Sequence, residues 1–299
     1  MTTIITQDTV FAAVDHLWTD EADRPALAPF KKFYVLNDSI LFFSGYIDPI
    51  LAVLAGYIGD RLGIDEEFAE WMAKAAEMDG RTCEVIEVER ETGSVVYYQG
   101  AVRREELDFI FYGAGSGSDY ALDSYLSGVG IIQESGNSYD FLLHGENLIH
   151  TSMMNAFRRD VCSGGDFSFI AWDNYCLLKD QLGWVETSQL DDYNNCIMTK
   201  ITEHFGTKKE LIELVSQIAD EQIEDEKEME IEAKIFDQSD NRGYSPQTNL
   251  AAKGRNTMSN TTQQKPRVAV KTSGSERGTV LSASSLKARL AQRKAQGLS

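Results

Sequence analysis

Residues 2–15 read TTIITQDTVFAAVD, and this stretch decides the fold class. Two runs of β-branched and apolar residues, 2–6 and 9–15, are separated by two polar positions, which predicts two strands joined by a turn. The same pattern returns in FYVLND (33–38) and SILFFSG (39–45), which we expect to form a hairpin. The beginning of the chain is therefore expected to be built from strands.

Helical and strand patterns then alternate along the chain. We expect helices over 48–62, 65–78, 120–126 and 146–161, and strands over 83–89, 94–100, 107–113, 166–172 and 175–181. Asp48 is expected to cap its helix, with Pro49 in the first turn. Residues 129–145 support no assignment. This order predicts an α+β fold in which two stacked sheets lie between helical layers, a four-layer αββα sandwich.

Composition excludes several classes of protein. The 299 residues, 42% of them hydrophobic, are enough for one or two domains with a sizeable core. No apolar run reaches the roughly 20 residues that a membrane span needs, and MTTIITQD lacks the pattern of a signal peptide. The four cysteines show no CxxC spacing, and the four histidines are scattered. We therefore expect no membrane, no metal, no cofactor, and free thiols in the cytoplasm.

Charge divides the chain unevenly. Residues 241–299 carry 11 Lys/Arg and one acid, so the first 240 residues hold 17 of the 28 bases and 46 of the 47 acids. These proportions predict a domain over 2–195, an acidic helical extension over 196–236 and a disordered basic tail over 237–299. Within that tail, SSLKARLAQRKAQ (284–296) has the pattern of a short basic amphipathic helix, which suits docking onto a partner.

The N-terminus offers a candidate nucleophile. Removal of Met1 would leave Thr2 with a free α-amine beside its own hydroxyl. An α-amine titrates at about pH 7.7–8.0, so at neutral pH it can take the proton of a nearby hydroxyl. Threonine with its terminal amine is a known nucleophile–base pair. Because many proteins begin with Met-Thr, this feature alone is weak.

Other positions strengthen the hypothesis. Asp15 ends a strand pattern and Lys32 precedes the next, and a lysine oriented by an aspartate favours a nearby alkoxide. Ser116 lies in a glycine-rich turn, and Asp160 and Ser163 follow a predicted helix in RDVCSGG. Each also has an ordinary explanation, as a strand-end charge, a simple turn or a helix stop with a glycine cap.

Six short motifs occur together in one order. They are MTTIIT, AAVD, KKFYVL, FFSGYID, YGAGSGSDYA and FRRDVCSGG. In this order and at nearly these spacings, residues 2–180 resemble proteasome β subunits and the bacterial HslV peptidase. The family consists of threonine peptidases with an N-terminal nucleophile, so the resemblance implies that the chain is an endopeptidase.

The resemblance also implies roles for individual residues. Thr2 matches the nucleophile, and Asp15 and Lys32 match the acid–lysine pair that tunes it. The network around the terminal amine is matched by Ser116, Asp160 and Ser163. Gly45 matches the glycine whose N–H helps form the oxyanion hole, a contribution on the order of 10²–10³ in rate. Positions implied to contact the substrate are Phe30, Tyr34, Phe43 and Ile47, for which core packing is an equally good explanation.

Some features depart from the family pattern. The connection between the first two strands is shorter than in HslV, which puts the register of Asp15 in question. Residues 129–145 look like an insertion, and the chain continues for about 100 residues beyond the usual end of such subunits.

Partners follow from the resemblance alone. Similar subunits form closed homo-oligomeric rings around a chamber, so we expect peptide or unfolded protein substrates and an AAA+ ATPase unfoldase. The basic tail is expected to dock on an acidic partner or on the body of its own chain. Two other hypotheses stay open: a non-catalytic structural or assembly protein of this fold, and an amidohydrolase acting on a small molecule. A capsid-associated peptidase, located in a virion, is a further alternative that no motif supports.

Overall fold

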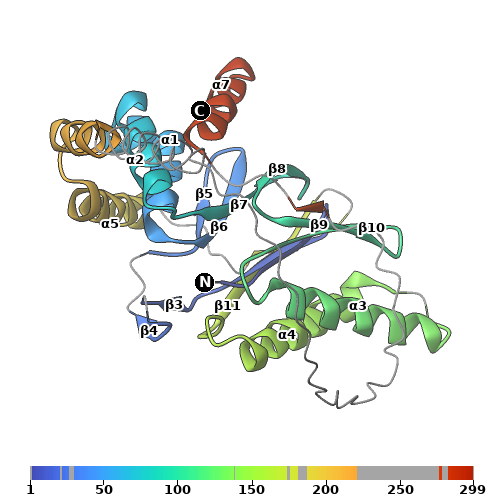
Figure 1. The fold of residues 1–299 in the computed structure, drawn as a ribbon. Helices are drawn as coiled ribbons and strands as arrows, with labels where there is room; N and C mark the ends of the chain where they lie inside the picture. The colour runs from blue at the N-terminus through green and yellow to red at the C-terminus, as the bar shows by residue number, and fades with distance from the viewer. Residues whose placement is uncertain are drawn as a thin grey trace, which may run out of the picture. The chain divides into compact units, whose positions relative to one another are not determined.

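The computed structural model describes residues 2–20, 22–26, 30–137, 139–173, 176–180, 187–220, 276–277 and 282–298. The chain divides into two compact units: Met1–Glu213 with Ser273–Ser299, and Leu214–Thr272. In the second unit the described residues, 214–220, are helical. The first unit is a mixed α/β structure with several sheets and helices (Figure 1).

The larger sheet has seven strands in the order β12-β11-β2-β1-β10-β9-β13. Their bounds are β1 Ile4–Gln7, β2 Phe11–Asp15, β9 Val102–Glu106, β10 Phe109–Ala114, β11 Phe167–Asp173, β12 Cys176–Asp180 and β13 Glu276–Arg277. Every neighbouring pair is antiparallel. The central pair, β1 and β2, is the stretch with which the chain begins. This position explains why each of its residues is buried.

The second sheet has four antiparallel strands in the order β5-β6-β7-β8. They are β5 Phe33–Val35, β6 Ser39–Gly45, β7 Cys83–Glu89 and β8 Val95–Gln99. A separate pair of two-residue strands, β3 Trp18–Thr19 and β4 Pro25–Ala26, lies between β2 and β5 along the chain.

Alternation along the strands produces two hydrophobic cores. Ile4, Ala12 and Val14 face one core together with Phe42 and Ile86 of the smaller sheet, so the two sheets pack against each other. The intervening residues, such as Ile5 and Ala13, face the opposite side. There they pack against residues of two helices, including Leu122, Tyr125 and Met153.

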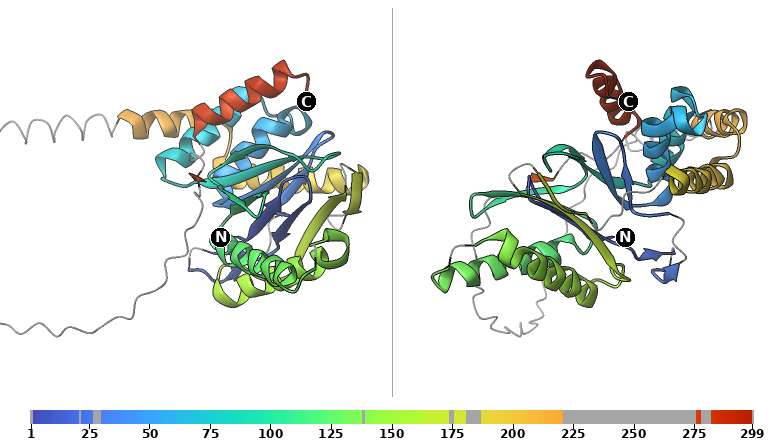
Figure 2. Two further views of the ribbon diagram at one scale, coloured as in Figure 1. Left: turned by 90° about the vertical axis from the view of Figure 1, so that its right-hand side faces the viewer. Right: turned by 180° about the vertical axis from the view of Figure 1, so that it is seen from behind.

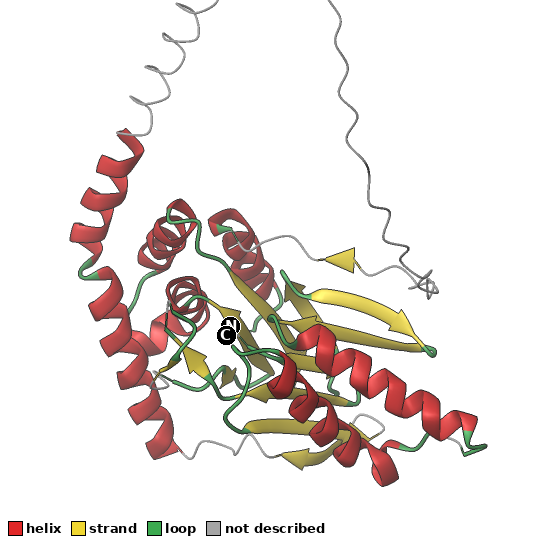
Figure 3. Ribbon diagram, turned by 60° about the horizontal axis from the view of Figure 1, so that its bottom comes forward, coloured by secondary structure: helices red, strands yellow, loops and turns green. Residues whose placement is uncertain are grey.

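Helices cover the outer face of each sheet. On the larger sheet lie α3 (Ser118–Glu134) and α4 (Phe141–Arg159), which run side by side in Figure 2. On the smaller sheet α1 (Ile47–Leu62) contacts β6 and β7. It also contacts α2 (Glu66–Met78), α5 (Thr187–Phe205) and α7 (Ala283–Ala295). Figure 3 distinguishes these helices from the strands beneath them.

The structure corrects several expectations. Strand β9 was not expected, and residues 129–145 belong mostly to the end of α3 and the beginning of α4. Asp48 does not cap α1, whose N-cap is Tyr46 without a side-chain hydrogen bond. The carboxylate of Asp48 instead contacts the side chains of Arg81 and His204, which are distant in sequence.

The C-terminal region also differs from the expectation. The first unit continues beyond residue 195 to Glu213, because α5 packs against α1. Residues 283–295, placed in the disordered tail, form α7 with a capping box at Ser282 and Ser285, so that prediction was wrong for this segment. The amphipathic helix expected there is present. The remaining predicted tail between 237 and 275, and the acidic run 221–236, lie outside the described residues.

Candidate active site

A buried ion pair lies where β2 of the larger sheet ends and β5 of the smaller sheet begins. The Nζ atom of Lys32, just before β5, donates to Oδ1 of Asp15, the last residue of β2, at 3.0 Å. Their side chains are 1% and 0% exposed. Burial lowers the pKa of Lys32, while the carboxylates of Asp15 and Asp160 act in the opposite direction. Lys32 is therefore bonded to the carboxylate of Asp15 in a buried site, and the charge of Asp160 acts on it as well.

Asp15 connects this lysine to two other parts of the chain. Its Oδ1 also accepts from the backbone N–H of Thr3 at 3.1 Å, and its Oδ2 accepts from the N–H of Gly164 at 3.1 Å. The N–H of Asp15 donates to the carbonyl of Thr3 at 3.1 Å. One carboxylate thus fixes the first residues of the chain, Lys32 and the segment after α4 relative to one another.

A chain of hydroxyls leads away from the N-terminus. Thr3 Oγ1 donates to Ser163 Oγ at 2.6 Å, and Ser163 Oγ donates to Oδ2 of Asp160 at 2.5 Å. Ser116 Oγ donates to the same Asp160 oxygen at 2.6 Å. Hydrogen bonds from hydroxyls to a carboxylate are short and strong, so these four side chains form one connected network.

Thr2 lies beside this network and is only 2% exposed. Its carbonyl accepts from the N–H of Gly117 at 3.4 Å. Gly115, with φ of +85°, is so close that a Cβ there would lie 1.8 Å from the carbonyl oxygen of Thr2. Glycine is therefore required at 115 both by backbone conformation and by the approach of the N-terminal segment.

Gly45, the other glycine that the resemblance singles out, is the last residue of β6. Its φ is +110°, and a Cβ would lie 2.5 Å from the carbonyl oxygen of Thr82. The conformation is one that side-chain-bearing residues rarely adopt. Its assignment to an oxyanion hole stays a prediction.

The four predicted substrate positions are mostly covered. Phe30, Tyr34 and Phe43 are buried, and Ile47, at the first turn of α1, is partly exposed. Tyr193 of α5 lies against the rings of Phe30 and Tyr34, with ring centroids 6.4 and 5.5 Å apart. Contact of these residues with a substrate stays a prediction.

Sequence reasoning missed two participants. Thr3 supplies both a backbone N–H and a hydroxyl to the network, but nothing in its sequence position distinguishes it from a strand residue. Tyr193 donates to the carbonyls of Lys31 and Phe33 at 2.8 and 3.0 Å. Its aromatic ring in an otherwise polar stretch, inside the predicted domain, was the available signal.

The arrangement suits proton transfer at the N-terminus. Thr3 contacts both Asp15, which binds Lys32, and Ser163, which leads to Asp160 and Ser116. Among the described residues, no group of three or more His, Cys, Asp or Glu side chains is arranged to hold a metal ion. In the same part of the chain, no helix has the length and apolar character needed to cross a membrane.

Comparisons with known proteins give distant likenesses only. No family model matches the chain, and no curated protein matches it. Among solved structures, eukaryotic HslV from Trypanosoma brucei is similar at 18% identity over 57% of this chain and 99% of that chain, with a TM-score of 0.36. Anbu from Hyphomicrobium sp. strain MC1 is similar at 11% identity over 69% and 97%, with a TM-score of 0.38. Its Gly-1 mutant gives 12% identity with the same coverage and TM-score. All three TM-scores are below 0.5, so these likenesses do not decide the fold or the family.

Proposed function

We propose that the protein is a threonine peptidase whose nucleophile is Thr2 after removal of Met1. The observation that carries the proposal is the double role of Asp15, which binds both Lys32 Nζ and the N–H of Thr3 inside the protein. This contact holds a buried lysine within one carboxylate of Thr3, the residue that follows the proposed nucleophile, and a cation near Thr2 would stabilise an alkoxide there. The resemblance of six sequence motifs to threonine peptidases supports the same conclusion.

The proposed reaction is acyl transfer. Thr2 Oγ attacks the carbonyl carbon of the scissile peptide bond while the α-amine of Thr2 takes its proton. The N–H of Gly45 donates to the tetrahedral oxyanion, and the leaving amine receives the proton as the C–N bond breaks. Water then hydrolyses the resulting ester and restores Thr2. Lys32 lowers the cost of charge on Oγ, and the Ser163–Asp160–Ser116 network orients the amine.

The wider proposal follows from the resemblance. The two sheets and their covering helices would be the four-layer αββα sandwich of an N-terminal-nucleophile hydrolase. We infer a homo-oligomeric ring in the cytoplasm that cleaves peptides or unfolded proteins, with an ATPase unfoldase as partner. Native mass spectrometry would test the ring, because a monomer or dimer contradicts it.

Two measurements test the peptidase. Mass analysis should find Thr2 as the first residue, and the protein should cleave fluorogenic peptides. Thr2→Ala should abolish cleavage without changing the circular dichroism spectrum, whereas Thr2→Ser should keep measurable turnover because it keeps the hydroxyl. A threonine-directed covalent inhibitor should add its mass to the N-terminal peptide. Retention of Met1 together with absence of cleavage would rule the proposal out.

A second candidate is an assembly protein without catalysis. It is favoured by the burial of Thr2 and by the cover that Tyr193 forms over Phe30 and Tyr34. Under this hypothesis Thr2→Ala leaves assembly and every other property unchanged, and no peptide is cleaved. The same variant therefore discriminates between the two functions.

A further inference from the structure

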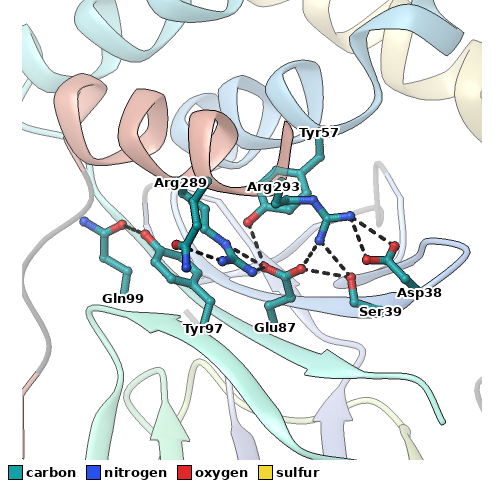
Figure 4. Close-up of polar contacts among 9 residues, drawn as sticks. Asp38, Ser39, Tyr57, Glu87, Tyr97, Gln99, Arg289 and Arg293 are labelled. Carbon is teal, nitrogen blue, oxygen red and sulfur yellow. Dashed lines mark hydrogen bonds and ion pairs between the residues drawn. The ribbon is translucent and has the colours of Figure 1, made fainter. Parts of the chain in front are cut away.

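A fully buried carboxylate, that of Glu87, lies outside the candidate active site. Glu87, in the middle of β7, is 0% exposed and points toward α1 and α7 (Figure 4). From the body of the unit it accepts from Ser39 Oγ and Tyr57 OH, both at 2.9 Å. Two neutral hydroxyls do not neutralise a buried carboxylate, so a cation is needed to offset the cost of burying its charge.

The cations come from α7. Arg289 donates to Glu87 Oε2 through Nη2 at 2.7 Å and Nε at 3.1 Å. Arg293 donates to Glu87 Oε1, and its Nη2 atom binds both oxygens of Asp38 at 3.0 and 3.1 Å. Burial alone would lower the pKa of Arg289, but its hydrogen bonds with Glu87 raise it overall. Arg289 and Arg293 are only 5% and 4% exposed.

The same face of α7 supplies apolar contact. Leu286, Arg289, Leu290 and Arg293 are its buried residues, a spacing of three and four that puts them on one side of the helix. Leu290 lies over Gly56 of α1, where a Cβ would come within 2.8 Å of the leucine Cδ1. The guanidinium groups of Arg289 and Arg293 lie over the rings of Tyr97 and Tyr57 at 4.8 and 5.0 Å.

At the edge of this surface α7 forms ion pairs that are exposed to solvent, unlike those of the two arginines. Lys287 pairs with Glu70 of α2 at 2.7 Å, and Lys294 pairs with Glu66, but both lysine side chains are mostly exposed. Exposed pairs of this type are screened by solvent and contribute little to binding. The lysines therefore provide matched controls on the same helix for the two buried arginines.

We propose that the surface around Glu87, formed with Asp38, Ser39, Gly56 and Tyr57, is a receptor for a basic helix with two arginines four residues apart. Its occupant is residues 283–295 of this chain, acting as a tethered ligand. Strand β13, which pairs with β9 of the larger sheet, is separated from α7 by five residues, so a short connection and the contacts around Glu87 both hold this helix on the unit. A peptide of residues 280–298 lacks β13 and carries the contacts of the helix alone.

Another helix of the same pattern could compete with α7 for this surface. When α7 leaves, Ser39 and Tyr57 are the only partners that Glu87 keeps among the described residues. Another helix with leucine and arginine at the same spacing would fit the same surface. The proposal concerns this surface alone and does not depend on the peptidase.

The test uses the full-length protein with a protease recognition site inserted between residues 250 and 265. After the folded protein is cleaved, size-exclusion chromatography and native mass spectrometry report whether the C-terminal fragment stays bound. We expect the fragment to co-elute, and Arg293→Glu or Glu87→Gln to release it. Lys287→Glu, with a similar charge change at an exposed position, should leave it bound. Circular dichroism before cleavage identifies any variant that does not fold.

A quantitative measurement completes the test. A fluorescent peptide covering residues 280–298 should displace the cleaved fragment. The same peptide with Arg289→Ala should bind at least about 30-fold more weakly, because the buried carboxylate of Glu87 loses one of its two cationic partners and both hydrogen bonds from Arg289. The peptide with Lys287→Ala should bind within about threefold of the parent. Separation of the unsubstituted fragment on cleavage, or equal losses for Arg289→Ala and Lys287→Ala, would overturn the proposal.

Discussion

The ammonium of Lys32 lies 3.0 Å from the carboxylate of Asp15, and both side chains are buried between the sheets. A buried pair of charges gives little net stability relative to an apolar pair, but removal of one partner leaves the other charge unpaired. The pair is therefore sensitive to substitution even though it is not a strong source of stability.

We predict that Lys32→Met destabilises the protein by about 3–5 kcal/mol, because it leaves the buried carboxyl of Asp15, whose pKa burial already raises, without its charged partner. The double variant Asp15→Asn/Lys32→Met should recover part of this loss, since it removes both charges. Urea denaturation followed by circular dichroism gives the free energies of unfolding. Lys31→Met, at the exposed neighbouring position, is the control and should change stability by no more than about 0.5 kcal/mol. Equal effects at 31 and 32 would contradict the buried pair.

Gly115→Ala is predicted to destabilise the protein by more than about 1 kcal/mol. The left-handed backbone conformation alone costs about that much for alanine, and the Cβ would also meet the carbonyl oxygen of Thr2. Gly130→Ala in α3 is the matched control, since its Cβ would meet nothing within 4 Å. That substitution should stabilise the helix by roughly 0.5–1 kcal/mol. Thermal denaturation of both variants measures the difference, and a neutral Gly115→Ala would show that the N-terminal segment lies elsewhere.

Asp160→Asn should lower kcat of the proposed peptidase by about 10²-fold while the fold stays intact. It removes the charge to which Ser116 and Ser163 both donate, and proton transfer by a positioned group typically contributes this much. Steady-state cleavage of a fluorogenic peptide gives kcat. Asp119→Asn, an exposed carboxylate on α3 paired with Arg104, should leave kcat unchanged. An active Asp160→Asn variant would exclude this network from catalysis.

The contribution of Asp48 to the free energy of unfolding is predicted to depend on pH. Burial acts to raise the pKa of Asp48, but hydrogen bonds from His204 and Arg81 outweigh it and hold the pKa below its ordinary value of 3.8. A depressed carboxylate pKa stabilises the folded state above the unfolded pKa, and this stabilisation is lost as the pH falls through the folded pKa. Asp48→Asn should therefore be less stable than the parent at pH 5, with a difference that shrinks below about pH 4. Urea midpoints from pH 5 to pH 3 measure it, and a constant difference would be inconsistent with this linkage.

Local sequence patterns predicted much of the fold. The alternating apolar residues of 2–15 and 39–45 correspond to β1, β2 and β6, and the helical periodicity of 65–78 corresponds to α2. Strand β9 was not predicted because VRREE is charged and lacks the apolar alternation of a strand; it lies between β10 and the two-residue edge strand β13. Asp48 has the position of a cap, yet its carboxylate contacts Arg81 and His204, which are distant in sequence, and Tyr46 is the N-cap of α1.

The sequence by itself predicted a nucleophile at Thr2 and a set of side chains around it, Asp15, Lys32, Asp160 and Ser163. Only the tertiary structure decided that Thr3 joins them, because strand pairing brings residues 3, 15 and 163 within hydrogen-bonding distance. The tertiary structure also decided where the basic C-terminal helix packs. A local pattern predicts that such a helix can form, but its place depends on Glu87, a buried charge some 200 residues earlier in the chain that α7 neutralises.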